Sequence, residues 1–262
     1  MKAVELEGVC RHFRSENGTL TTALEGVDMT IPAGGFASVI GPSGCGKSTL
    51  LGLISGTDRA DAGVVRLGGH VVDSPSSETA MVFQEPALFP WLSVRGNVEY
   101  GLRARGVPKD KRRELSDWAL SLVHLERFDG HRPHELSGGM RQRTAIARAL
   151  ALSPEVLLMD EPFAALDAQT RNVLEEELQQ IYVKTTPTVL LVTHSLIEAC
   201  FQSDVVFVMS ARPGRIIARY DIDLPRPRQQ GDPRLAELRA EMFGVLRAEV
   251  DRARAVEEAV AA

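Results

Sequence analysis

A glycine-rich segment followed by lysine and serine carries the clearest chemical signal in the sequence. It reads Gly41-Pro42-Ser43-Gly44-Cys45-Gly46-Lys47-Ser48 and matches the phosphate-binding pattern G-x-x-x-x-G-K-[ST]. Glycines let consecutive backbone N–H groups turn toward one anion, and a helix that begins near Lys47 would add the positive end of its dipole. Composition alone predicts only about 0.004 chance matches to this pattern. The segment therefore predicts a nucleotide site in which Lys47 reaches the terminal phosphates and Ser48 coordinates Mg²⁺.

Two acids close an apolar stretch later in the chain. Residues 156–159 are apolar throughout, and Asp160 and Glu161 follow directly. An apolar strand does not readily hold two neighbouring carboxylates at its end unless a cation lies nearby. Together with a phosphate loop, the pair predicts that Asp160 holds the Mg²⁺ shell and that Glu161 polarises a water for attack on the γ-phosphate. The alternative is that both acids only end the strand at the surface.

Further polar residues stand where ligands collect in α/β proteins. Gln84 follows the apolar run 80–83, and His194 follows the run 189–192. The carboxyl ends of parallel strands are the usual ligand edge of such sheets. Taken alone, a polar residue such as Gln84 at a strand end is usually only solvated, and a lone histidine such as His194 is usually structural.

A second anion-binding helix start is predicted at Ser137. This residue is a favourable N-cap, and Gly138 and Gly139 follow it at the beginning of an expected helix. The chain would then have two anion nests but one lysine-bearing loop. Both nests can serve the same nucleotide if two copies of the chain face each other head to tail. An ordinary capped helix is the alternative.

The elements that must position these residues indicate an α/β sheet. Compact apolar runs, typical of parallel strands covered on both faces, occur at 36–40, 80–83, 156–159, 189–192 and 205–209. Helical stretches at 47–55 and 168–183 lie between some of them. The first third of the chain instead alternates apolar with polar residues, as half-buried strands do, and residues 64–72 predict a hairpin.

The interval between Phe83 and Val156 contains no convincing strand. It holds three predicted helices, at 94–105, 111–128 and 138–151, which suggests a helical insertion in the α/β core. The proline-rich residues 224–228 predict a linker. Apolar residues at helical spacing from Pro233 onward predict a final amphipathic helix.

Composition limits the class of protein. The chain has 262 residues, 44% of them hydrophobic and 25% charged, which excludes a disordered, collagenous or disulfide-stapled protein. No apolar run approaches the roughly 20 residues needed to cross a bilayer, and no signal peptide is expected. Three cysteines without paired spacing fit a reducing cytosol. A formal net charge of −5 argues against a dedicated nucleic-acid binder.

The motifs resemble, in order and spacing, those of ABC transporter ATPase subunits. The matching segments are Gly41–Thr49 (Walker A), Gln84 (Q-loop), Leu136-Ser137-Gly138-Gly139-Met140 (signature), Leu157–Glu161 (Walker B), Ala165-Leu166-Asp167 (D-loop) and His194 (H-loop). The resemblance covers about Val4 to Tyr220. It implies a P-loop NTPase (RecA-like) core with an antiparallel β subdomain and an α-helical subdomain. The expected organisation is an ATPase domain over 1–222, with the helical subdomain at about 86–152, and a linker and helical extension over 223–262.

The resemblance also implies roles for single residues. ATP would lie between two copies, with Ser137 of one copy touching the γ-phosphate held by Lys47 of the other. Phe13 matches the aromatic residue that stacks on adenine, although a core or edge aromatic is the competing interpretation. Asp167 would couple the two sites. The implied catalytic group is Glu161, His194 and Gln84, and the implied Mg²⁺ group is Ser48, Gln84 and Asp160.

Two departures from the family pattern are visible, and other segments point to a subfamily. Met140 and Gly35 stand where Gln and Glu are common. Met140 and residues 83–91 are similar to importer ATPases. Residues 211–216 together with residues 224–228 resemble the branch of these ATPases that serves nitrate, sulfonate and taurine import.

The expected protein is therefore the ATP-hydrolysing subunit of a bacterial ABC importer. It would sit at the cytoplasmic face of the inner membrane on transmembrane permease subunits, with a periplasmic substrate-binding protein as an indirect partner and no nucleic acid. A soluble ABC-type ATPase acting on nucleic acid or ribosomes, the ATPase of a split exporter and a small-molecule kinase are the alternatives.

Cys45 lies inside the predicted phosphate nest. A helix N-terminus lowers a thiol pKa, so one expectation is a reactive thiol whose alkylation blocks nucleotide binding. The other is a small filler side chain.

Overall fold

The computed structural model describes residues 1–14 and 18–261, and the chain divides into two units. The first unit combines residues 1–76 with 187–262, and the second comprises residues 77–186. Phosphate-loop and H-loop residues belong to the first unit. The Q-loop, signature, Walker B and D-loop residues belong to the second.

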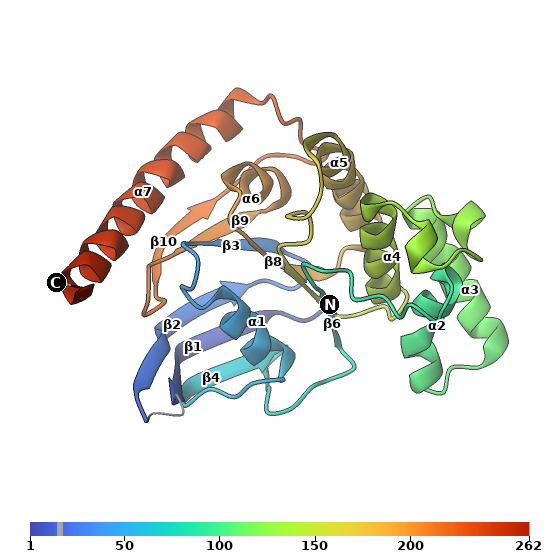
Figure 1. The fold of residues 1–262 in the computed structure, drawn as a ribbon, viewed down its shortest axis with the longest axis horizontal. Coiled ribbons are helices and arrows are strands. Elements are labelled where there is room, and N and C mark those ends of the chain that lie inside the picture. Colours follow the sequence, from blue (N-terminus) through green and yellow to red (C-terminus); the bar gives the residue numbers. More distant parts are fainter. Residues whose placement is uncertain (15–17, 262) are drawn as a thin grey trace. The chain divides into compact units, whose positions relative to one another are not determined.

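An antiparallel sheet forms the amino-terminal part of the first unit (Figure 1). Its strand order is β2-β1-β4-β5, with bounds Leu20–Ile31, Val4–Arg14, Ala62–Leu67 and His70–Val71. The predicted hairpin is confirmed, because β4 and β5 pair through Gly68 and Gly69. Both glycines have positive φ, at 56° and 81°, which is the backbone that a tight two-residue hairpin turn requires.

The apolar runs of the first unit form a second sheet. Its strands, in the order β10-β9-β3-β8, are Ile216–Asp221, Val205–Met209, Phe36–Ile40 and Thr188–Thr193. Strand β3 is parallel to both β8 and β9, whereas β10 is antiparallel to β9. Every residue of β3, β8 and β9 is buried, which is why these strands read as continuous apolar runs.

Three helices complete the first unit: α1 (Lys47–Ser55), α6 (Leu196–Gln202) and α7 (Pro233–Ala261). The predicted final helix is thus confirmed. It shares a buried cluster with α6 and β3, to which Leu235 and Met242 of α7 and Phe201 of α6 contribute. Residues 224–228 form neither helix nor strand, as predicted. Arg228 is buried and donates to the carbonyl oxygens of Cys200 and Ile222, which holds this linker against the unit.

The second unit contains two parallel strands and most of the helices. Strands β6 (Thr79–Val82) and β7 (Val156–Asp160) pair with Ala80 opposite Leu157 and Val82 opposite Met159. The helices are α2 (Val94–Ala104), α3 (Lys109–Leu122), α4 (Gly138–Leu150) and α5 (Ala168–Thr185), with 3-10 turns at Glu126–Phe128 and Pro133–Glu135. Helices α2, α3 and α4 pack on one another (Figure 1), which confirms the three predicted helices.

One helix is shorter than its sequence pattern predicts. The expected helix over 111–128 ends at Leu122, because His124 adopts a left-handed backbone with φ of 56°. The Leu125 N–H then bonds the Leu120 carbonyl at 3.0 Å, and the His124 N–H bonds the Ser121 carbonyl at 3.4 Å. These two bonds form a Schellman motif, which satisfies the last carbonyls and stops the helix even without glycine.

Among the described residues, no helix has both the length and the apolar character that crossing a bilayer requires.

Candidate functional site

The phosphate loop joins the end of β3 to the start of α1, as the motif requires. Gly44 and Gly46 have φ of 76° and 103°, which side-chain-bearing residues rarely adopt. A Cβ added at Gly41 would lie 2.8 Å from the Cys45 sulfur. Each of these glycines is therefore needed for the loop to close into a cradle.

Lys47 lies folded over this cradle. The side chain is only 8% exposed, and its Nζ donates to the carbonyl oxygens of Gly41 at 2.9 Å and Pro42 at 3.1 Å. Gly46 is the N-cap of α1 and has no side chain that could cap the first N–H groups of the helix. An ammonium group, a helix N-terminus and a glycine-built backbone nest at one place together suit a phosphate chain.

Cys45 contradicts the expectation of a reactive thiol. Its side chain is fully buried. Burial raises the pKa of the Cys45 thiol above its ordinary value, although the charge of Lys47 acts in the opposite direction. The helix N-terminus does not dominate here, because removing the thiolate from water costs more than the nearby positive charge returns. Cys45 is the small filler of the loop.

Alkylation of the folded chain near neutral pH should modify Cys10 and spare Cys45 and Cys200. Cys10 is half-buried, whereas Cys45 and Cys200 are buried, and burial raises the pKa of Cys200 to about 11. The thiolate that reacts is populated only as the pH approaches these raised values. Peptide mass spectrometry after iodoacetamide treatment measures the pattern, and denatured chain is the control in which all three thiols react. Labelling of Cys45 as fast as Cys10 would contradict the buried thiol.

His194 leaves the same edge of the sheet as the phosphate loop. Strands β3 and β8 are parallel, with Ile40 opposite Thr193, so the residues that follow each strand emerge side by side. The turn at His194 is held on both sides: Thr193 Oγ1 accepts from Ser195 N at 3.0 Å and donates to the buried Glu198 carboxylate at 2.6 Å. The structure thus brings the predicted H-loop and Walker A residues together.

Phe13 is on β1 of the first unit and points to the surface. Its side chain is 42% exposed, which excludes the core interpretation left open by the sequence. The Arg11 guanidinium lies 4.7 Å from the ring centroid and is held by ion pairs to Asp58 and Asp61, at 2.7 and 3.0 Å. One cation–π contact therefore orients the ring.

The second unit brings Gln84 and Asp160 to one edge. Because β6 and β7 are parallel with Val82 opposite Met159, the residues that end and follow these strands lie together. Glu161, directly after β7, has a left-handed backbone with φ of 43°. Such strained non-glycine residues cost about 1–3 kcal/mol and are concentrated at functional sites. The left-handed conformation of Glu161 turns the chain directly after Asp160, where β7 ends.

The segment after Gln84 is held by two residues that the sequence patterns did not single out. Arg148 of α4 donates to the carbonyl oxygens of Pro86 and Ala87 at 2.8 and 2.7 Å. Asn97 of α2 is fully buried and exchanges hydrogen bonds with the Phe89 backbone, at 2.8 and 3.2 Å. Neither residue belongs to a local motif, so only their contacts reveal this function.

Ser137 caps α4, as predicted, and remains exposed. Its Oγ accepts from Met140 N at 3.2 Å, which leaves the hydroxyl hydrogen to donate elsewhere. The two glycines that follow differ in their packing. A Cβ at Gly139 would lie 2.6 Å from Thr170 Cγ2, whereas one at Gly138 would lie 3.7 Å from its nearest neighbour, in Leu166. Close packing of α4 on α5 therefore requires Gly139, but not Gly138.

Asp167 begins α5 as its N-cap and accepts from Thr170 N at 3.0 Å. This N–H holds the pKa of the Asp167 carboxyl below its usual range, so the group is ionised at neutral pH. It is fully exposed and charged, which suits a residue that faces another molecule.

The residues predicted for Mg²⁺ offer the right chemistry. Ser48, Gln84 and Asp160 present a hydroxyl, an amide and a carboxylate oxygen, which are the hard ligands that Mg²⁺ prefers. In the part of the chain that the structure describes, no three or more His, Cys, Asp or Glu residues form a metal-binding group by themselves. Mg²⁺ is usually bound by one or two protein oxygen ligands together with substrate phosphates, so the hydroxyl, amide and carboxylate oxygens of these residues suit it.

A glycine cradle between a buried parallel strand and a helix, with acids ending another such strand, defines a P-loop nucleotide-binding protein. Residues 24–164 match the family described as ABC transporter. The chain is 45% identical to a taurine import ATP-binding protein of Rhizobium johnstonii, over 91% of this chain and 94% of that protein. It is 43% identical to a nitrate import ATP-binding protein of Synechocystis, over 85% and 83% of the respective chains.

The structural comparison agrees with the sequence comparison. A dimeric ATP-binding cassette in a post-hydrolysis state, bound to ADP and phosphate, superimposes with a TM-score of 0.74 at 31% identity. The match covers 85% of this chain and all of that one. The chain therefore belongs to the ABC transporter family and is one of its ATPases, and the predicted fold class is confirmed.

Proposed function

We propose that this chain is the ATP-hydrolysing subunit of a bacterial importer for small solutes of the nitrate, sulfonate or taurine type. The observation that carries the proposal is the presence, on one chain, of a lysine-bearing phosphate cradle and a second helix start with an exposed serine cap at Ser137. The relatives named as taurine and nitrate import subunits support the solute class.

The phosphate chain of ATP would lie against residues 41–48, with Lys47 moving from its loop carbonyls to the terminal phosphates. Ser48, Gln84 and Asp160 would hold Mg²⁺, which supplies charge neutralisation on the phosphate oxygens. Phe13 would stack on adenine, since its oriented ring is exposed.

Hydrolysis needs a water in line with the bond between the β- and γ-phosphates. Glu161 would accept a hydrogen bond from this water and polarise it, and His194 would contact both the water and the γ-phosphate. As the water attacks, its oxygen would form the new P–O bond while the bridging P–O bond breaks, and Glu161 would accept the proton that the water loses, so that the products are ADP and inorganic phosphate.

Two copies would enclose the nucleotides. Ser137 of one copy would donate its hydroxyl hydrogen to the γ-phosphate held by Lys47 of the other, and the charged Asp167 would contact the opposite site. The dimeric cassette bound to ADP and phosphate supports this arrangement.

The transmembrane permease would dock on the segment that follows Gln84. Trp91 is 65% exposed, and its ring centroid lies 5.5 Å from that of Phe89, which in turn lies 4.3 Å from that of Tyr100. Exposed aromatic clusters of this kind mark protein-interaction surfaces. Docking there would place the chain at the cytoplasmic face of the membrane, and a periplasmic binding protein would deliver the solute to the permease.

Reconstitution tests the proposal directly. Tagged chain purified from detergent-solubilised membranes of its own host is expected to bring permease subunits with it. In proteoliposomes the complex should then take up taurine, an alkylsulfonate or nitrate, dependent on ATP and binding protein. Trp91→Ser should weaken the association without lowering basal ATP turnover, and Trp118→Ser on α3, also exposed, is the matched control. Recovery with ribosomes or nucleic acid, or ATP-driven movement outward, would contradict the proposal.

A further inference from the structure

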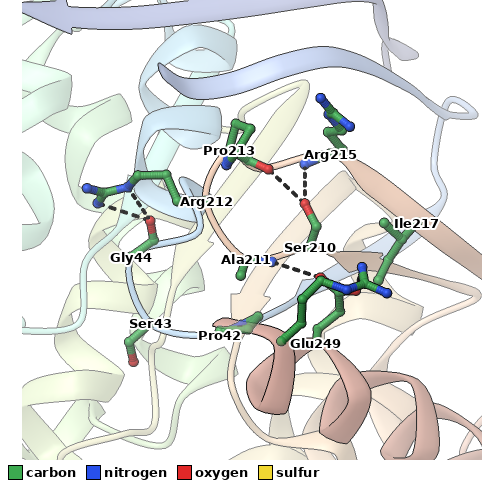
Figure 2. Close-up of a pocket in the computed structure, with 11 residues that line it drawn as sticks. Pro42, Ser43, Gly44, Ser210, Ala211, Arg212, Pro213, Arg215, Ile217 and Glu249 are labelled. Atoms are coloured by element: carbon green, nitrogen blue, oxygen red, sulfur yellow. Dashed lines mark hydrogen bonds and ion pairs between the residues drawn. The ribbon is translucent and has the colours of Figure 1, made fainter. Parts of the chain in front are cut away.

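A short loop between β9 and β10 lies directly against the phosphate loop (Figure 2). This loop, residues 210–215 and called here the supporting loop, is closed by its own hydrogen bonds. Ser210 Oγ accepts from Arg215 N at 2.9 Å and donates to the Pro213 carbonyl at 2.8 Å. The Ser210 N–H also bonds the Arg215 carbonyl at 2.9 Å. These hydrogen bonds hold the loop in one conformation, so a contact made at one of its residues can fix the position of another.

At Gly214 the supporting loop lies between β2 and the phosphate loop and contacts both. Its N–H bonds the Ala23 carbonyl at 2.9 Å, and its carbonyl accepts from Glu25 N at 3.0 Å. A Cβ added at Gly214 would lie 2.1 Å from the Cys45 carbonyl oxygen, so the two backbones touch. The supporting loop therefore packs directly against the phosphate loop at Cys45.

Arg212 adds a directed contact to this packing. Its Nη2 and Nε donate to the Gly44 carbonyl oxygen at 3.2 and 3.3 Å. The C=O and N–H of a trans peptide point in opposite directions, so a cation on the Gly44 oxygen sets the direction of the Cys45 N–H. That N–H closes the turn onto the Pro42 carbonyl at 3.3 Å. Arg212 thus orients the peptide at the bend of the cradle.

The supporting loop is in turn anchored by the C-terminal helix. Glu249 of α7 is only 5% exposed, and its Oε2 accepts from Ala211 N at 3.3 Å (Figure 2). Its other oxygen pairs with Arg252 of the same helix. A continuous series of contacts therefore runs from α7 through residues 211 and 212 to Gly44.

The surroundings leave Arg212 room to move when this series is broken. A cavity of about 510 Å³ lies among Pro42, the supporting loop, and Glu249 and Arg252 of α7. Arg212, which also lines it, is exposed. The position of its guanidinium therefore depends on its hydrogen bonds more than on packing. Removing it should alter the phosphate loop without unfolding the chain.

We propose that Arg212 is a positioning residue for the nucleotide phosphates, acting through the Gly44 carbonyl, and that Glu249 makes the C-terminal helix part of this support. The inference rests on the proposed binding of ATP phosphates by residues 41–48. It extends that function to residues 210–215 and to α7, which lie outside the Walker A, Q-loop, signature, Walker B, D-loop and H-loop segments.

Nucleotide titration of the full chain tests the proposal. Arg212→Ala is expected to raise the Kd and the KM for MgATP about tenfold, because a hydrogen bond from a charged donor is lost, while kcat at saturating ATP and the Tm without nucleotide stay unchanged. Arg212→Lys should restore part of the affinity, since a single ammonium can still reach one carbonyl. Arg215→Ala is the matched control: Arg215 lies in the same loop, and its side chain pairs with Glu25 at 2.8 Å.

Glu249→Ala removes the oxygen that accepts from the Ala211 N–H and so tests the link to α7. This variant should raise the Kd for MgATP less than Arg212→Ala does. The double variant should bind MgATP no more weakly than Arg212→Ala alone, because Glu249 acts on the phosphate loop only through the contact between Arg212 and the Gly44 carbonyl. Additive effects would overturn the link.

Lys47→Ala distinguishes a failure of this inference from a failure of the proposed binding of ATP phosphates by residues 41–48. If Lys47→Ala lowers the affinity for MgATP while Arg212→Ala leaves it unchanged, Arg212 is not a positioning residue and the proposed function stands. The same conclusion follows if Arg215→Ala raises the Kd for MgATP as much as Arg212→Ala does. If Lys47→Ala binds MgATP as the unaltered chain does, the assignment of the phosphate loop itself fails.

Discussion

The Glu161→Gln chain is expected to bind MgATP with unchanged affinity and to hydrolyse it about 10²–10⁴-fold more slowly. Glutamine keeps the size of the side chain and its ability to contact water, but it is a far weaker acceptor for the proton of an attacking water. Because ATP then persists, the variant should also accumulate as a nucleotide-bound dimer. Single-turnover kinetics and size-exclusion chromatography in MgATP measure the two effects.

The backbone at Glu161 makes this substitution clean. Its left-handed conformation, with φ of 43°, strains glutamate and glutamine alike, so the fold should not distinguish them. Glu176→Gln, at an exposed position of α5 in the same unit, removes the same charge and should leave turnover unchanged. Near-normal turnover by Glu161→Gln would remove Glu161 from the role of general base.

Mixing two inactive variants should restore ATP turnover. In a head-to-tail dimer each site takes Lys47 from one copy and Ser137 from the other, so Lys47→Ala and Ser137→Asp each disable both sites of a homodimer. A mixed dimer has one intact site and one doubly altered site. Random mixing makes half of the dimers mixed, so recovery of about a quarter of the normal turnover is expected if the sites act independently.

The choice of aspartate at position 137 follows from the structure. Ser137 caps α4 by accepting from Met140 N, and aspartate caps helices equally well. The helix is therefore retained, while a carboxylate replaces the hydroxyl donor and repels the γ-phosphate. Ser93→Asp is the matched control, since Ser93 caps α2 by accepting from Gly96 N at 3.1 Å and should tolerate the change.

The mixing experiment has a clear contrary result. If Ser137→Asp alone turns over ATP normally, Ser137 does not face a nucleotide. If each variant is inactive and the mixture stays inactive although mixed dimers form, the two residues do not complete one another's sites.

Local patterns predicted much of the fold because local physics determines those parts. Strands β3, β8 and β9 are buried on both faces, so nearly every residue in them is apolar and the run itself reveals the strand. The start of α1 was predicted at Lys47 because the preceding glycines and the lysine are adjacent in the chain. The end of α3 differs from the predicted one, since apolar spacing continues past Leu122 whereas the backbone at His124 is left-handed.

The chemistry of the phosphate loop was determined by the sequence alone, because a nest of backbone N–H groups needs only consecutive residues with the right conformational freedom. Tertiary structure decided how that loop is supported and how its cysteine behaves. Cys45 is buried and its thiol pKa is raised because segments distant in the chain cover it, and the residues next to it in sequence do not predict that burial. Arg212 reaches Gly44 across 168 positions of sequence, a pairing that exists only once β3 and β9 lie side by side.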